Sequence, residues 1–127
     1  MVKILVADDH PIVRQRLKEM LQEGFPSASL ELATDTESLL SLALEQEWDI
    51  IISDLVMPGG GGLFAIKKIR EIKPAQLSII ISIYPDEQYA SHAMNAGASA
   101  FLNKNNADND LVKTVKKLLE GVSKDLV

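Results

Sequence analysis

Five short apolar runs alternate along the chain with segments whose apolar residues recur at helical spacing. Two of the runs, residues 50–52 and 79–81, consist of isoleucine alone. Continuous β-branched runs of this length are typical of strands buried on both faces of a sheet. We predict strands over 3–8, 28–33, 49–54, 77–82 and 99–103. The second and fifth runs are less uniformly apolar than the others, which favours edge positions for them and a central position for 49–54.

Five helices are expected between and after these strands. Pro11 fits the first turn of the first helix, and the segment 34–37 has the pattern of a capping box at the start of the second. The third helix is expected to stop before Pro74. The fourth has a weaker pattern, which begins at 85–87 and ends near Gly97. Regular alternation of strands and helices predicts an α/β fold, (βα)5, with a doubly wound parallel sheet.

Composition and charge narrow the class of protein. The 127 residues, 46% hydrophobic and 24% charged, suit one globular domain over 1–127, and we expect no effector domain in this chain. A net charge of −5 argues against nucleic-acid binding, which requires clustered basic residues. No segment has the roughly 20 apolar residues of a membrane span, and the amino end lacks the pattern of a signal peptide. There is no cysteine, so thiolate metal sites and disulfides are excluded. We therefore expect a cytoplasmic protein that does not contact membranes.

Three aspartates lie at the ends of two predicted strands. Asp8 and Asp9 follow the first apolar run, and Asp54 follows the third. Because ligands of open parallel sheets bind at the carboxyl ends of the strands, we expect these side chains at one rim. Three neighbouring carboxylates repel one another unless a cation lies between them, and Mg²⁺ is the leading candidate. For a single acidic residue there, a cap on the following helix is an equal alternative, but the three together favour a metal site. An aspartate can also act as a nucleophile toward phosphorus.

A hydroxyl and a lysine follow two further strands. Ser82 ends the fourth apolar run and Lys104 follows the fifth. Alone, each is an ordinary turn or surface residue, but at an acidic rim they would bind phosphoryl oxygens. The four glycines at 59–62 lack the lysine and hydroxyl of a nucleotide-binding loop and are better explained as a flexible helix entry. For His10 a loop or cap role is favoured, because Mg²⁺ prefers oxygen ligands.

At these residues the chain resembles the receiver domain of response regulators in two-component signalling. The resemblance covers essentially the whole sequence and implies a flavodoxin-like sheet of strand order 2-1-3-4-5. It implies that Asp54 is the phosphoacceptor and that Lys104 and Ser82 bind the phosphoryl group. It also implies a Mg²⁺ site. The implied metal ligands are Asp8, Asp9, Asp54 and the backbone carbonyl of Met57.

The segment 8–14 resembles the NarL/LuxR-type subfamily, whose members usually carry a C-terminal helix-turn-helix domain. We expect no such domain in this chain, which leaves an excised receiver and a stand-alone one as alternatives. Ser82 and Phe101 match the two switch positions, although many receivers have tyrosine instead of phenylalanine. Val56 and Tyr84 match positions that tune the lifetime of the phosphorylated form, and their character favours a long lifetime.

The leading functional hypothesis is a phosphorylation switch. A sensor histidine kinase is expected to donate a phosphoryl group to Asp54. The surface formed by 86–120 is then expected to change and to select a homodimer partner or an effector, with transcription regulation as the expected output. A binding module that signals without phosphorylation is the alternative. A phosphohydrolase is disfavoured, because such enzymes carry an acid two residues after the nucleophile and this chain has Val56 there. We therefore expect a phosphoacceptor that assists its own modification and is no classical enzyme.

Overall fold

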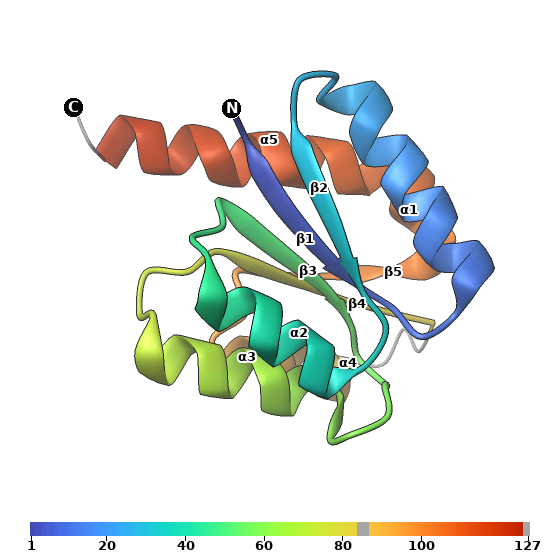
Figure 1. Ribbon diagram of the computed structural model, residues 1–127, viewed down its shortest axis with the longest axis vertical. Helices are drawn as coiled ribbons and strands as arrows, with labels where there is room; N and C mark the ends of the chain where they lie inside the picture. The colour runs from blue at the N-terminus through green and yellow to red at the C-terminus, as the bar shows by residue number, and fades with distance from the viewer. Residues whose placement is uncertain (84–86, 126–127) are drawn as a thin grey trace.

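The fold is a three-layer α/β sandwich, described here from a computed structural model that covers residues 1–83 and 87–125 (Figure 1). All five strands are parallel and lie in the order β2-β1-β3-β4-β5, which confirms the predicted topology. The strands are β1 (Lys3–Ala7), β2 (Ser29–Ala33), β3 (Ile50–Asp54), β4 (Ser78–Ser82) and β5 (Ala100–Asn103). β3 and β4 are buried along their whole length, whereas β2 and β5 are largely half-buried, so the predicted central and edge positions are confirmed.

Two groups of helices cover the two faces of the sheet. α1 and α5 pack on one face, and α2, α3 and α4 on the other (Figure 1). The helices are α1 (Pro11–Gly24), α2 (Thr36–Glu45), α3 (Gly61–Ile72), α4 (Glu87–Asn95) and α5 (Ala107–Asp125), with a short 3-10 helix, η1 (Lys104–Asn106), before α5. None of the helices in the described ranges is long and apolar enough to cross a membrane.

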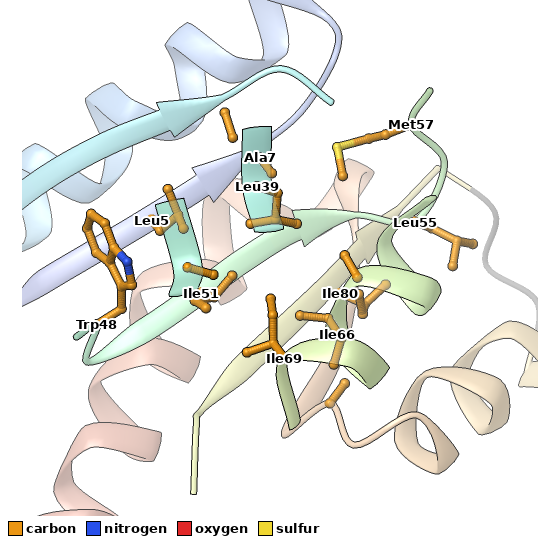
Figure 2. Packing of buried hydrophobic residues seen from close by; sticks show 14 of the residues in the cluster. Leu5, Ala7, Leu39, Trp48, Ile51, Leu55, Met57, Ile66, Ile69 and Ile80 are labelled. Atoms are coloured by element: carbon orange, nitrogen blue, oxygen red, sulfur yellow. The ribbon is translucent and has the colours of Figure 1, made fainter. Parts of the chain in front are cut away.

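Each face of the sheet has its own hydrophobic core. Alternate side chains of a strand point to opposite faces, so Ile51 and Ile80 belong to the core under α2 and α3, while Ile52 and Ile79 belong to the core under α1 and α5. Figure 2 shows the first of these cores. Trp48 packs into it and donates its ring N–H to the carbonyl of Leu42 at 2.9 Å. Trp48 is therefore a packing residue of this core.

The starts of α2 and α4 were both predicted from the sequence. The predicted capping box at the start of α2 is present, but it lies one residue later than the pairing of Thr34 with Glu37. Asp35 is the N-cap, and its carboxylate accepts a hydrogen bond from the Ser38 backbone N–H at 2.7 Å. The Ser38 hydroxyl accepts in return from the Asp35 N–H at 3.2 Å. The capping box lies one residue later than predicted because the Ser38 side chain accepts from the N-cap N–H, the role that glutamate has in most capping boxes. α4 begins at Glu87, and the predicted start at 85–86 lies outside the described residues.

Candidate functional site

The carboxyl ends of the strands bring most of the predicted site residues together. Asp8 and Asp9 follow β1, Asp54 and Ser82 end β3 and β4, and Lys104 follows β5. All of them except Asp8 line a cavity of about 350 Å³ on this rim of the sheet. Side chains from four strand ends and the first turn of α1 line it: Asp9, His10, Val13, Asp54, Val56, Ser82, Ile83 and Lys104. Asp8 lies beneath, completely buried.

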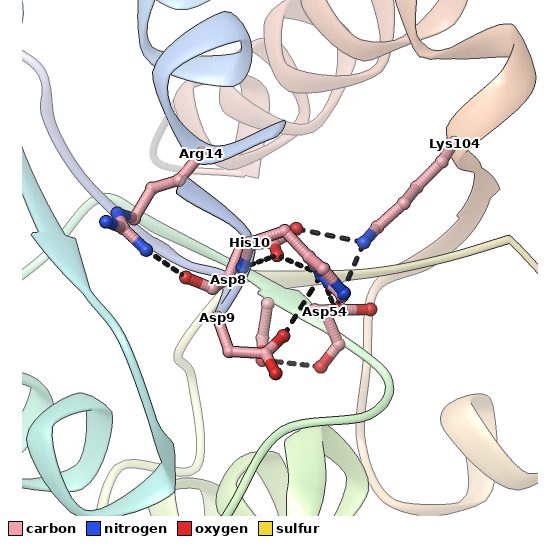
Figure 3. A network of polar contacts seen from close by, with 7 residues as sticks. Asp8, Asp9, His10, Arg14, Asp54 and Lys104 are labelled. Atoms are coloured by element: carbon pink, nitrogen blue, oxygen red, sulfur yellow. Dashed lines mark hydrogen bonds and ion pairs between the residues drawn. The ribbon is translucent and has the colours of Figure 1, made fainter. Parts of the chain in front are cut away.

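Lys104 forms the central ion pairs of the site. Its ammonium nitrogen lies 3.0 Å from Asp8 Oδ2 and 3.0 Å from Asp54 Oδ2 (Figure 3). Burial opposes the charge on the lysine, but the two carboxylates outweigh burial, so the pKa of Lys104 is raised. The lysine therefore stays charged at physiological pH, and it neutralises part of the acidic cluster.

The carboxyl group of Asp54 is held in a less favourable environment. Burial raises its pKa, and the nearby carboxylate of Asp8 adds to this, whereas contact with Lys104 acts in the opposite direction. The net effect is a raised pKa, because the effect of burial exceeds that of the single ammonium, which Asp54 shares with Asp8. A further cation beside Asp54 would lower the energy of its ionised form.

The donor set fits a hard divalent cation. Ligand atoms of Asp8, Asp9, Asp54 and His10 all lie within 4.8 Å of one another. Two carboxylate oxygens of the cluster are buried: Asp8 Oδ2, which lies 3.0 Å from the Lys104 ammonium, and Asp9 Oδ1, which lies 3.1 Å from His10 Nδ1. Buried carboxylate oxygens are normally paired, and Mg²⁺ is bound in proteins mainly by carboxylate oxygens and water. The cluster therefore has the chemistry that such an ion requires.

The loop between β3 and α3 is tied down so that Asp54 is fixed in place. The Thr36 hydroxyl accepts a hydrogen bond from the Gly61 N–H at 3.0 Å, and the Thr36 N–H donates to the Pro58 carbonyl at 3.0 Å. A Cβ at Gly62 would lie 2.2 Å from the carbonyl oxygen of Asp54, so a side chain is excluded there. Gly62 thus serves a close approach of α3 to the end of β3.

The sequence matches the response regulator receiver domain over residues 4–116. The chain belongs to this family. It is 33% identical over 122 residues to the glycerol metabolism activator of Pseudomonas putida, a match that covers 95% of this chain and 55% of that protein. It is 33% identical over 121 residues to the oxygen regulatory protein NreC of Staphylococcus epidermidis, covering 94% of this chain and 56% of that protein. The chain thus spans about half the length of these curated relatives.

Solved structures agree with this assignment. A two-component response regulator of the LuxR family from Aurantimonas has a TM-score of 0.89 at 30% identity, covering 95% of this chain and 86% of the other. A receiver domain protein from Clostridium thermocellum has a TM-score of 0.88 at 27% identity, with full coverage of both chains. The predicted NarL/LuxR-type resemblance is confirmed by these relatives.

The remaining predicted residues of this receiver occupy less central positions. Val56 lines the cavity, but its side chain is 59% exposed. Phe101 is half-buried in β5 and packs against the core under α2 and α3. The Met57 side chain is buried in that same core (Figure 2), and the role of its backbone carbonyl stays a prediction. Tyr84 lies outside the described residues.

Two side chains of the receiver site make contacts that sequence reasoning did not predict, although the predicted cap position of His10 at the start of α1 is confirmed. The His10 ring lies among the three carboxylates, with Nδ1 at 3.0 Å from Asp8 Oδ1 and 3.1 Å from Asp9 Oδ1. The Arg14 guanidinium, one turn further along α1, donates to the Asp8 backbone carbonyl at 2.8 Å (Figure 3). The only sequence signal for either was the proximity of both residues to the acidic pair, which does not show where a side chain points.

Proposed function

We propose that this receiver accepts a phosphoryl group on Asp54 from a sensor histidine kinase. The observation that carries this proposal is the position of Lys104, which lies 3.0 Å from an Asp54 carboxylate oxygen at the wall of a cavity large enough for a phosphoryl group. A carboxylate oxygen of Asp54 attacks the phosphorus of the donor phosphohistidine. The bond from phosphorus to the imidazole nitrogen breaks, and its electron pair stays on the imidazole.

The other residues of the cavity have roles that follow from their charge. Lys104 pairs with a phosphoryl oxygen and offsets the charge that Asp54 gains, and Ser82 donates a hydrogen bond to another. Asp8, Asp9, Asp54 and the Met57 carbonyl are the residues that would hold Mg²⁺. When bound, the ion would neutralise the carboxylates and orient the phosphoryl oxygens.

The signal is proposed to leave the site through Ser82 and Phe101. Ser82 is buried at the end of β4, and its register partner in β5 is Asn103, two residues from Phe101. A shift of Ser82 toward the phosphoryl group would move the end of β4 and change the packing of Phe101. Because Phe101 carries no hydroxyl, this switch would act by packing alone. The face formed by 86–120 would then select a second copy of the chain or an effector.

The role of this receiver in a whole regulator depends on residues that lie outside the match to its relatives. Its curated relatives are about twice as long as the match, and their names describe regulators of glycerol metabolism and of oxygen responses. We propose that residues 1–127 form one receiver domain in the cytoplasm, which controls a transcription effector and binds no nucleic acid or membrane itself. A stand-alone receiver that acts by protein binding is the alternative. In either case the domain is a signalling module and no classical enzyme.

Incubation with Mg²⁺ and acetyl phosphate tests the proposal. Intact-mass spectrometry should show the addition of one phosphoryl group to the wild type. The addition should be absent in Asp54→Asn and retained in the control Asp35→Asn, since Asp35 caps α2 on the other side of the loop and asparagine caps equally well. Equal modification of Asp54→Asn would refute Asp54 as the acceptor. An unmodified wild type that still binds a partner would favour signalling without phosphorylation.

A further inference from the structure

His10 is held inside the acidic cluster. Its Nδ1 lies 3.0 Å from Asp8 Oδ1, 3.1 Å from Asp9 Oδ1 and 3.7 Å from Asp54 Oδ2. The ring thus contacts all three carboxylates that would hold the metal (Figure 3). The ring itself is 62% exposed, so contact with the carboxylates, and not packing in the core, accounts for its position.

The backbone keeps this ring in place. The His10 N–H donates to Asp8 Oδ1 at 2.8 Å, and the Arg14 guanidinium holds the Asp8 carbonyl at 2.8 Å. The Asp8 N–H in turn donates to the carbonyl of Ala33 in β2 at 3.1 Å. His10 is also the N-cap residue of α1, with Pro11 in the first turn restricting the following backbone. These hydrogen bonds therefore fix the His10 backbone, from which the ring extends, relative to Asp8.

The distances match those between neighbouring ligands of one metal ion. Two ligand atoms at right angles, each about 2.1 Å from an ion, are about 3.0 Å apart. Nδ1 lies at that separation from an oxygen of Asp8 and from an oxygen of Asp9. Asp9 Oδ1 is itself buried, and this same ring nitrogen lies beside it. An ion placed between these atoms would satisfy that oxygen and would lie within reach of the imidazole.

We propose that His10 Nδ1 is a metal ligand, so that this receiver has a mixed nitrogen and oxygen site. Such a site would favour divalent ions that bind imidazole well, such as Ni²⁺ and Zn²⁺, over Mg²⁺ to a greater degree than an all-oxygen site would. Nδ1 would bind through its lone pair, with the ring proton on Nε2. This inference rests on the proposed function only in that the same carboxylates hold the ion.

The competing explanation is that the ring is a cation that takes the place of the metal. A protonated imidazole is attracted to the three carboxylates by the same contacts, and it would have to leave before an ion enters. The two explanations predict opposite effects when the imidazole is removed. A lost ligand weakens the binding of imidazole-preferring ions, whereas a lost competitor tightens the binding of every divalent ion.

Calorimetric titration of the untagged chain with Mg²⁺ and with Ni²⁺ distinguishes a His10 ring that binds the metal from a ring that competes with it. The chain has two histidines, so His10→Gln can be compared with His92→Gln, a change at an exposed position in α4. We expect the ratio of Ni²⁺ to Mg²⁺ affinity to fall about tenfold or more in His10→Gln, as losses of groups that support a metal commonly do. The ratio should be unchanged in His92→Gln.

Pulsed electron paramagnetic resonance with Mn²⁺ supplies a direct readout. A coupling from a directly bound ¹⁴N nucleus should be present in the wild type and in His92→Gln, and absent in His10→Gln. An unchanged affinity ratio, or tighter binding of both ions by His10→Gln, would overturn the inference and leave the proposed phosphoacceptor intact. Failure of the wild type to bind Mg²⁺ and to accept a phosphoryl group would instead overturn the proposed function, and the inference with it.

Discussion

The Lys104 ammonium lies 3.0 Å from the carboxylate of Asp54 and is shared with Asp8 at the same distance. One cation thus serves two carboxylates that are both buried, with Asp9 and the His10 ring beside them. Burying a charge is unfavourable unless it is paired, so the cluster depends on Lys104 whenever no metal is bound. The arrangement prepares the site for an added cation as well as for an added phosphoryl group.

Replacing Lys104 by methionine should destabilise the metal-free protein by about 3 kcal/mol, because two buried carboxylates lose their partner. Urea unfolding measures the change. Mg²⁺ should restore more stability to Lys104→Met than it adds to the wild type, since the ion replaces the missing positive charge. Lys67→Met, at an exposed position on α3, is the control and should unfold like the wild type. If Lys104→Met were as stable as the control, the lysine would not be the group that balances the cluster.

Asp54→Asn should raise the stability of the metal-free protein, and the gain should depend on pH. Burial first, and then Asp8, raise the pKa of Asp54 above its ordinary value of 3.8. The folded state therefore holds this proton more tightly than the unfolded state, and wild-type stability falls as pH rises through the interval between the two pKa values. Asparagine does not ionise, so Asp54→Asn does not lose stability in this way as the pH rises.

The difference between Asp54→Asn and the wild type should accordingly be smallest below pH 3.8 and grow to a plateau above the raised pKa. Thermal unfolding across this interval in metal-free buffer measures it. A difference that does not vary with pH would mean that Asp54 has the same pKa in the folded and unfolded states.

Gly62→Ala should lower both stability and phosphorylation. The added Cβ would meet the Asp54 carbonyl oxygen at 2.2 Å and the Ser53 hydroxyl at 2.9 Å, so the end of β3 or the start of α3 must move. Such overpacking costs about 1–3 kcal/mol. Gly121→Ala in α5 is the matched control, because a Cβ there meets nothing within 4 Å. That change should stabilise the protein by about 0.5–1 kcal/mol through helix propensity. Equal effects of the two substitutions would contradict the close approach at Gly62.

Val56→Asn should shorten the lifetime of the phosphorylated form. Val56 lines the cavity beside Asp54, and its methyl groups offer no hydrogen bond to a water molecule approaching the phosphoryl group. An amide at this position would orient that water. Decay can be followed by intact mass after removal of acetyl phosphate, with Ile72→Asn at the far end of α3 as a control of similar exposure. Slower decay in Val56→Asn than in the wild type would refute this role.

Much of the site was predictable because it depends on where strands end. The apolar runs placed β1, β3 and β4 to within about a residue, and parallel strands put their carboxyl ends on one rim. Asp8, Asp54, Ser82 and Lys104 therefore meet regardless of the details of packing. The cap of α2 was less predictable, because Thr34 with Glu37 and Asp35 with Ser38 have the same spacing, and only the folded register selects the second pair.

The sequence by itself determined the topology and the set of charged and polar groups at the rim, because strand periodicity and residue chemistry are local properties. Only the tertiary structure decided how those groups pair. Lys104 comes from the far edge of the sheet to be shared by Asp8 and Asp54. His10 takes the predicted cap position of α1, but only the folded structure directs its ring into the carboxylates. These choices depend on side-chain direction and on the balance between burial and charge. Both are settled when the strands and helices pack together.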